Sequence, residues 1–234
     1  MTAAGDPAIA ANLAAVQARI TTAARAAGRD PAAVQLLAVS KTHPAAAVRT
    51  AYAEGQRAFG ENRVQELVAK ANELRDLTDV QWHLIGSLQT NKVRELLAVP
   101  GLALLHSLDR ARLADELQRE LVLQQRHLAV LLQVNASGDT NKHGCAMADA
   151  PALLEHVLAH CPALDVRGVM AMGPLTGDPR PVFERAAALR SALQHSSGLP
   201  FPILSLGMSG DLDLAIAAGS TLVRIGTAVF GGRG

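Results

Sequence analysis

The chain is poor in aromatic residues, and this shortage limits its partners. One tryptophan, one tyrosine and four phenylalanines among 234 residues leave a core of Ala, Leu and Val. They provide no aromatic platform on which nucleic-acid bases would stack. The net charge of +1 is equally unlike the strongly basic surface of a nucleic-acid-binding domain. We therefore expect no nucleic-acid partner.

Cysteine is also scarce, and the two thiols are Cys145 and Cys161. Cys145 lies close to His143, but no second pair follows at the spacing of a zinc site. The sequence therefore predicts core or loop cysteines and no metal centre.

The chain lacks a long hydrophobic run, so no segment reaches the length of a membrane-spanning helix. Residues 1–30 are rich in alanine and contain three arginines, a composition found in some import presequences. Their apolar residues instead fall on one helical face, which predicts a first helix docked on the protein. We expect a cytoplasmic protein without a membrane partner. The face consists of Ile9, Leu13, Val16 and Ile20.

Lysine is rare too, with four residues against eighteen arginines, and Lys41 has an unusual position. It ends an apolar run that begins at Val34 and is followed at once by a Thr-His-Pro sequence. Lysine, unlike arginine, can lose its proton and act as an amine nucleophile. A lysine at a strand end is therefore a candidate for Schiff-base chemistry. For Lys41 alone, a solvated charge that closes the strand is the alternative.

Short apolar runs alternate with helical patterns along the chain. Most runs are continuously hydrophobic, which is typical of parallel strands covered on both faces. Eight strand–helix repeats after an extra N-terminal helix predict an α/β fold, a single (β/α)8 TIM barrel over residues 1–234 with a helix in residues 1–30 packed on it. An open doubly wound sheet is the alternative, but it would carry a glycine-rich turn after its first strand. The expected strands are 34–39, 57–60, 80–85, 102–106, 128–134, 166–170, 203–206 and 221–225.

The expected helices lie between these strands. Their patterns are less sharply bounded than those of the strands. They cover 44–54, 63–77, 89–98, 110–125, 149–160, 180–195 and 209–218.

Active groups of such a barrel lie at the carboxyl ends of its strands, often with a phosphate site after strands seven and eight. Two turns there, at 207–210 and 226–227, combine glycines with a hydroxyl residue, a composition suited to an anion. Ordinary strand–helix turns are the alternative. Asp211 and Asp213 follow the first turn, and we expect both to face solvent, since they would otherwise repel an anion.

Arg224 interrupts an otherwise apolar strand, and a buried guanidinium needs a partner. A structural ion pair with Glu61 is one interpretation. A contact to an acceptor on a ligand near Lys41 is the other.

Six segments, in this order, resemble those of the YggS/PROSC-type pyridoxal-phosphate homeostasis proteins. The resemblance runs from about Leu36 to Gly232 and implies a barrel of the alanine-racemase N-terminal type. Arg63 departs from it, since many relatives have tyrosine there, and the loop 135–144 is variable in the family. The segments are LAVSKT at 37–42, FGENRVQE at 59–66, WHLIGSLQTNK at 82–92, GVMA at 168–171, LSLGMS at 204–209 and GSTLVRIGT at 219–227.

The resemblance also implies a cofactor, pyridoxal 5′-phosphate, bound through its aldehyde. Lys41 matches the lysine that holds it as a Schiff base, and Arg224 matches the arginine facing its pyridine nitrogen. The remaining matches are to the phosphate-holding positions and to the polar residues beside the ring. Those at the phosphate are Ser209, Gly226 and Thr227, and those at the ring are Asn62 and His83.

We expect a carrier with no catalytic residue, which stores, protects and supplies the cofactor in the cell as a monomer or weak dimer. Apo-enzymes that depend on the cofactor are the candidate recipients. An arginine beside the pyridine nitrogen disfavours its protonation and weakens the ring as an electron sink. The single tyrosine, Tyr52, is predicted on the first barrel helix, so the second acid/base of a racemase is missing.

Other functions stay open at this point. An amino-acid racemase or lyase of low activity would use the same Schiff base. A class I aldolase would also use a lysine and a phosphate turn, although its lysine usually lies on a later strand. A serine hydrolase is the weakest alternative, because the sequence 207–211 does not match its G-x-S-x-G turn.

Overall fold

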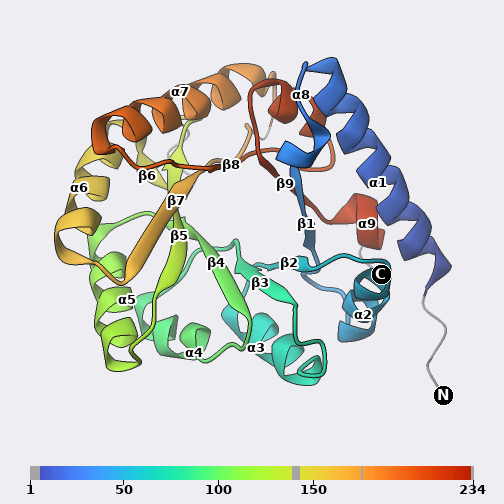
Figure 1. Ribbon diagram of the computed structural model, residues 1–234, viewed down its shortest axis with the longest axis horizontal. Helices are drawn as coiled ribbons and strands as arrows, with labels where there is room; N and C mark the ends of the chain where they lie inside the picture. The colour runs from blue at the N-terminus through green and yellow to red at the C-terminus, as the bar shows by residue number, and fades with distance from the viewer. Residues whose placement is uncertain (1–5, 139–142, 175, 233–234) are drawn as a thin grey trace.

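The computed structural model describes residues 6–138, 143–174 and 176–232. Eight parallel strands form a barrel in chain order, and the pairing of β4 with β5 closes it. Figure 1 shows the closed ring of strands from one end. The predicted TIM barrel is confirmed, and the open-sheet alternative is wrong. The strands are β1 (Gln35–Val39), β2 (Ala58–Glu61), β3 (Gln81–Leu84), β4 (Leu102–Leu108), β5 (Leu128–Asn135), β7 (Leu164–Met170), β8 (Ile203–Ser205) and β9 (Leu222–Ile225).

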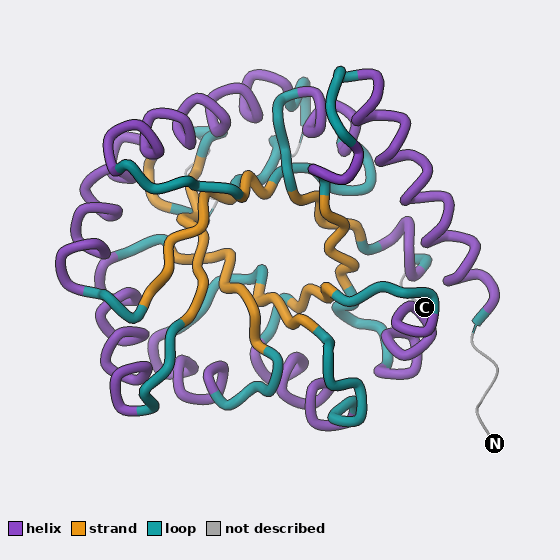
Figure 2. The backbone as a smooth tube through the Cα atoms, in the orientation of Figure 1, coloured by secondary structure: helices purple, strands orange, loops and turns teal. Residues whose placement is uncertain are grey.

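Helices surround the barrel as an outer layer, which Figure 2 shows in purple around the orange strands. The helices bury apolar side chains against the sheet or, in the case of α1, against other helices. They are α1 (Pro7–Ala26), α2 (Ala45–Ala53), α3 (Val64–Glu73), α4 (Val93–Leu97), α5 (Ala111–Leu123), α6 (Ala150–His160), α7 (Arg180–Ser197), α8 (Leu212–Ala217) and α9 (Thr227–Phe230), with three short 3₁₀ turns at Pro31–Ala33, Thr90–Lys92 and Met147–Asp149.

The N-terminal helix α1 packs along α2, α8 and α9 on the outside of the barrel. Asp6 caps it by accepting a hydrogen bond of 2.9 Å from the Ala8 N–H, and Pro7 occupies its first turn. The predicted apolar face, Ile9 to Ile20, is buried. In the part of the chain that the structure describes, no helix combines the length and the hydrophobicity needed to cross a membrane.

Several elements differ from the expected pattern, since α3 ends at Glu73 instead of 77 and the short α9 was not expected. The segment 89–98 forms a 3₁₀ turn followed by the short α4. Helix α8 begins at Leu212 because the residues before it form a tight turn that starts at Gly207, whose φ is +89°. A two-residue strand, β6 (Cys145–Ala146), pairs with β5 at the end of the 135–144 loop, of which residues 139–142 lie outside the described residues.

Two faces of the strands carry two kinds of side chain. The main apolar core lies between sheet and helices. Two smaller apolar clusters face the other way, into the barrel, and include Leu37 with Leu222 and Leu131 with Met170. Other inward positions, among them Arg224, are polar.

Candidate functional site

The strand ends bring the predicted site residues to one end of the barrel. Lys41 follows β1 by two residues, and Asn62 follows β2 directly. Gly226 and Thr227 follow β9, and Ser209 lies in the turn after β8. Because β1 pairs with both β2 and β9, and β9 pairs with β8, these loops are neighbours.

Gly226 lies close against the end of β1. A Cβ atom added there would lie 3.1 Å from the carbonyl oxygen of Val39. A larger residue would push the two strand ends apart. The glycine therefore keeps the turn after β9 beside the loop that carries Lys41.

His83 and Arg224 lie within strands and point into the barrel. Their chain neighbours on both sides belong to the outer apolar core, and side chains alternate along a strand. Arg224 and His83 are each about 5 % exposed. The outward neighbours are Trp82, Leu84, Val223 and Ile225.

The loop that carries Lys41 is held by a buried ion pair that the sequence did not predict. Lys70, on α3, donates hydrogen bonds of 2.7 Å to the Ser40 carbonyl oxygen and of 2.7 Å to Glu61 Oε1. The Ser40 hydroxyl donates to the same carboxylate oxygen at 2.6 Å. Glu61 therefore pairs with Lys70, and the interpretation that it pairs with Arg224 is wrong. The sequence signal for Lys70 was its residue type, because lysine is rare in this arginine-rich chain.

Glu66 extends this cluster to the next residue of the loop. Its Oε1 accepts a hydrogen bond of 3.1 Å from Lys70 and one from the Thr42 backbone N–H. Thr42 has a φ of +67°, a conformation that costs energy for a residue other than glycine. The cluster fixes the backbone on both sides of Lys41.

Burial dominates the electrostatics of this cluster. It raises the pKa of Glu61, against the opposing effect of the hydrogen bonds from Lys70 and Ser40. Glu61 Oε2 is buried and has no hydrogen-bond partner in the part of the chain that the structure describes. Within the described ranges, Lys41 itself is half-buried and its ammonium has no hydrogen-bond or ion-pair partner, so the amine is available to a ligand.

A second buried network runs through the barrel interior from Arg224. Its Nη1 donates two hydrogen bonds of 2.7 Å, to the carbonyl and the hydroxyl oxygen of Ser205, and its Nη2 donates to the Ala171 carbonyl at 2.9 Å. Ser205 Oγ lies 3.2 Å from His106 Nδ1, and His106 Nε2 lies 3.0 Å from His83 Nδ1.

The donor groups fix the direction of each hydrogen bond in this network. Arginine only donates, so Ser205 accepts from Arg224 and gives its own proton to His106 Nδ1. His106 then carries its proton on Nε2 and donates to His83 Nδ1, which leaves the His83 proton on Nε2. These proton positions are assigned from the hydrogen-bond network alone.

Burial keeps both imidazoles neutral. It lowers the pKa of His83 to about 4 and that of His106 well below its ordinary value, the latter with help from the nearby His83 and Arg224. Burial also lowers the pKa of Arg224, to about 10, which leaves the guanidinium charged at neutral pH. Of the side chains in this network, Arg224 therefore carries a fixed positive charge and both imidazoles are neutral at neutral pH.

His106 and Ser205 were missed by the sequence reasoning. Both interrupt buried apolar runs, as Arg224 does. A polar residue within a buried apolar run was therefore the sequence signal shared by His106, Ser205 and Arg224.

The turn after β8 is shaped by Gly207 and Asp211. A Cβ atom at Gly207 would lie 2.6 Å from the Ala215 Cβ atom, so the turn packs tightly on α8. The Asp211 carboxylate accepts a hydrogen bond of 2.6 Å from the Met208 N–H. The expectation that this carboxylate faces solvent is therefore wrong, because the backbone of the turn binds it.

Asp213 points away from the turn instead. It forms an ion pair with Arg19 of α1, and Arg19 Nη1 donates a hydrogen bond of 2.8 Å to the Ser209 carbonyl oxygen. The N-terminal helix thus holds the turn from outside. In the described ranges, the N–H groups of Ser209 and Gly210 have no backbone acceptor, so they stay available to an anion.

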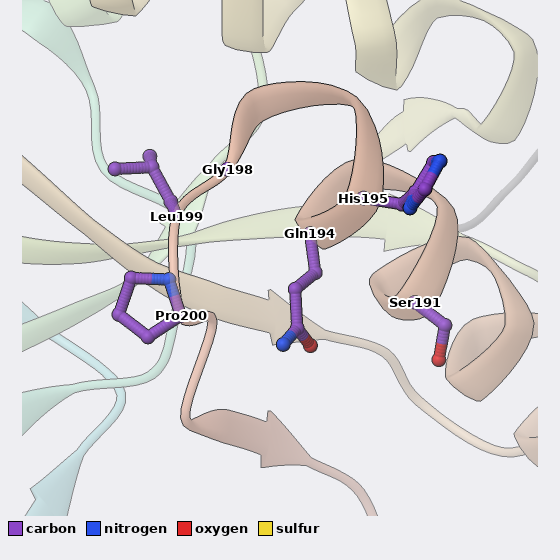
Figure 3. A pocket seen from close by; sticks show the side chains of 6 residues that line it. All are labelled: Ser191, Gln194, His195, Gly198, Leu199 and Pro200. Carbon is purple, nitrogen blue, oxygen red and sulfur yellow. The ribbon is translucent and has the colours of Figure 1, made fainter.

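One surface hollow, shown in Figure 3, lies away from these residues and is formed by the last turns of α7 and the loop before β8. That loop leads into the amino end of a strand, so the hollow is at the opposite end of the barrel from Lys41. Its lining residues are Ser191, Gln194, His195, Gly198, Leu199 and Pro200.

Comparison with known proteins shows the family of this chain. The family model for the alanine racemase N-terminal domain matches residues 11–234. A pyridoxal phosphate homeostasis protein of Pseudomonas aeruginosa is 49% identical over 96% of both chains. The chain therefore belongs to the alanine racemase N-terminal domain family and, within it, to the pyridoxal phosphate homeostasis proteins.

Two solved structures show the same fold. That of PipY from Synechococcus elongatus with pyridoxal 5′-phosphate bound is 40% identical, with a TM-score of 0.82 over 95% of this chain and 100% of the other. Alanine racemase from Corynebacterium glutamicum is 19% identical, with a TM-score of 0.69 over 95% of this chain and 60% of the racemase. The racemase likeness concerns the fold alone, and the racemase is considerably longer.

Proposed function

We propose that this chain binds pyridoxal 5′-phosphate as a reversible Schiff base on Lys41 and serves the storage, protection and supply of that cofactor in the cell. The observation that carries the proposal is the position of Lys41. It provides an unpaired amine at the end of β1, beside the turn at Gly226 and within a family whose member PipY has a structure with this cofactor bound.

The residues present fit the cofactor's chemical groups. Ser209, Gly226 and Thr227 would hold the phosphate through hydroxyl and N–H groups. Arg224 uses three of its five N–H groups on Ser205 and Ala171, so two have no acceptor among the described residues and are available to a pyridine nitrogen.

Asn62 and His83 would lie beside the ring. The hydrogen-bond direction worked out above leaves His83 with its proton on Nε2, so it acts there as a donor. Asn62 is exposed at the end of β2 and offers both an amide donor and an acceptor.

Pyridoxal 5′-phosphate supplies an aldehyde that condenses with amines and a ring that withdraws electrons. The Lys41 amine, once deprotonated, would be the nucleophile for this aldehyde, with formation of a C=N bond and loss of one water. Water reverses the reaction and frees the aldehyde. Lys41 is half-buried, which leaves water a route to this bond.

The surroundings favour a carrier over an enzyme. Arg224 places a fixed positive charge at the proposed pyridine position, and the imidazoles behind it are neutral. The only tyrosine, Tyr52, hydrogen-bonds Asp79 on the outside of the barrel. Asp79 precedes the amino end of β3, so this hydroxyl is at the wrong end of the barrel to act on a substrate above Lys41.

Borohydride reduction followed by peptide mass analysis tests the proposal. We expect a pyridoxyl adduct on the peptide that contains Lys41, and its loss in Lys41→Ala. Lys92→Ala is the matched control, because Lys92 pairs with Glu95 outside the barrel and should leave the adduct unchanged. An adduct on Lys70, or no adduct, would overturn the assignment.

A further inference from the structure

Helices α5 and α6 lie side by side on the outside of the barrel (Figure 1), and three side chains of different chemistry meet between them. Asp115 comes from α5, His156 from α6, and Cys161 ends α6. One ligand atom of each, a carboxylate oxygen, an imidazole nitrogen and the thiol sulfur, lies within 4.8 Å of the other two.

The direct contacts within the group are unequal. His156 Nε2 lies 2.6 Å from Asp115 Oδ1, a short hydrogen bond. The Cys161 sulfur lies 3.8 Å from the same oxygen, at the outer limit of a sulfur hydrogen bond. Among the described residues the thiol therefore has only this weak partner, although it is about 1 % exposed.

The backbone around the thiol is held firmly. The Cys161 N–H donates to the Val157 carbonyl and its own carbonyl accepts from Leu164, both at 2.9 Å. Gln118, one turn after Asp115, accepts a hydrogen bond of 2.8 Å from the Ala163 N–H. Helix α5 is thus tied to the segment just after the cysteine, and the group is pre-organised.

Exposure decreases across the group, which provides a path of entry. The Asp115 side chain is 54% exposed and that of His156 30%, whereas Cys161 is buried. A cation would arrive through the carboxylate and imidazole and reach the sulfur last. Thiolate, imidazole and carboxylate together are ligands that Zn²⁺ prefers, at about 2.0 to 2.3 Å from the metal.

We propose that Asp115, His156 and Cys161 form a Zn²⁺ site with three protein ligands and a water in the fourth position. On binding, Zn²⁺ takes the place of the hydrogen bond between Asp115 and His156, and the Cys161 thiol loses its proton to solvent as the sulfur–zinc bond forms. The site would join α5 to α6 and is independent of the cofactor function proposed above.

The sequence spacing concealed this group. Asp115 lies 41 residues before His156 and 46 before Cys161, far from any zinc-finger pattern. The prediction of no metal centre rested on the lack of a second ligand pair beside Cys145 and His143, and these two residues are not part of this group.

Cobalt substitution tests the proposal directly. Tag-free protein, dialysed against chelator, would be titrated with Co²⁺, which takes the same four-coordinate geometry and absorbs visibly. We expect one equivalent to produce the d–d bands of a four-coordinate site and a sulfur-to-cobalt charge-transfer band. Zn²⁺ should then abolish both by displacement. Saturation without a sulfur band would overturn the thiolate assignment.

Variants separate this site from adventitious binding. Zn²⁺ affinity, measured by competition with a chromophoric chelator, should fall at least about tenfold in Cys161→Ser and in Asp115→Asn. Cys145→Ser and His195→Ala are the matched controls and should bind as the wild type does. Equal affinity in all four variants, or no Zn²⁺ binding by the wild type, would overturn the site. Asp115→Asn keeps the test valid if Cys161→Ser fails to fold, because Asp115 is exposed.

Discussion

Lys70 donates a hydrogen bond of 2.7 Å to the carbonyl oxygen of Ser40, the residue immediately before Lys41. One lysine thus fixes the backbone that presents the other. The same ammonium pairs with the fully buried Glu61, so the loop's geometry depends on a charge pair that water does not reach.

Replacing Lys70 by methionine should destabilise the protein by about 3 to 5 kcal/mol, because the buried Glu61 carboxylate would lose its partner. Urea unfolding measures this change. Lys92→Met is the matched control, since its ion pair with Glu95 is partly exposed and should be worth about 0 to 1 kcal/mol. A double variant with Glu61→Gln should recover much of the loss. Equal effects of the two lysine changes would contradict the account.

The neutral histidines should make the protein sensitive to acid. The pKa of His83 is about 4 in the folded protein and about 6.5 in an unfolded chain. The unfolded chain therefore binds the proton first, and stability falls as pH drops from about 6.5 to about 4. The contribution is about 3 kcal/mol.

Unfolding free energies of wild type and His83→Gln, measured from pH 7 to pH 4, check this dependence. The wild type should lose more stability than the variant across that window. Parallel curves would mean that His83 takes up a proton without cost, against the burial described above.

Arg19 should affect binding of the cofactor's phosphate although it lies on the N-terminal helix. It holds the Ser209 carbonyl and the neighbouring Asp213. We expect Arg19→Met to weaken binding of pyridoxal 5′-phosphate about three- to tenfold, the value of one hydrogen bond. Binding of pyridoxal, which has no phosphate, should not change.

Arg49→Met provides the comparison, because Arg49 forms a similarly exposed ion pair with Asp76 on the outer helices. It should alter neither affinity. If Arg19→Met weakens the binding of pyridoxal 5′-phosphate and of pyridoxal equally, the helix acts on the whole barrel and not on the phosphate turn.

The loaded protein should exchange the Cα hydrogen of amino acids far more slowly than an ordinary racemase. In the proposed binding mode the Arg224 charge would leave the ring a weak electron sink, and Tyr52 is at the other end of the barrel. Incubation with L- or D-alanine in D₂O and mass analysis gives the rate. Exchange at enzyme rates, on the order of 1 per second or faster, would favour the racemase alternative.

The sequence predicted the barrel well because parallel strands buried on both faces are continuously apolar, as in Leu128–Asn135. It placed Lys41 correctly at a strand end for the same reason. The short β6 was not predicted because two residues are too few to show a periodic pattern. The start of α8 was placed too early because the bond from Met208 to the Asp211 side chain has no signature in the pattern.

The supporting networks of the site were less predictable. Lys70 and Glu61 lie nine residues apart on different elements, and His106 and Ser205 are separated by 99 residues. The first pair forms when α3 packs on β2, and the second only when the barrel brings β4 and β8 together. The sequence shows that each of these residues is polar in an apolar setting, but it does not show which of them are partners.

The visible absorption spectrum of the cofactor-loaded protein, wild type beside Lys41→Ala, tests the central claim most directly. We predict the absorption band of a protonated Schiff base in the wild type and in the Lys92→Ala control, and free-aldehyde absorption alone in Lys41→Ala. A Schiff-base band of undiminished strength in Lys41→Ala would show that another amine holds the aldehyde and would contradict the account.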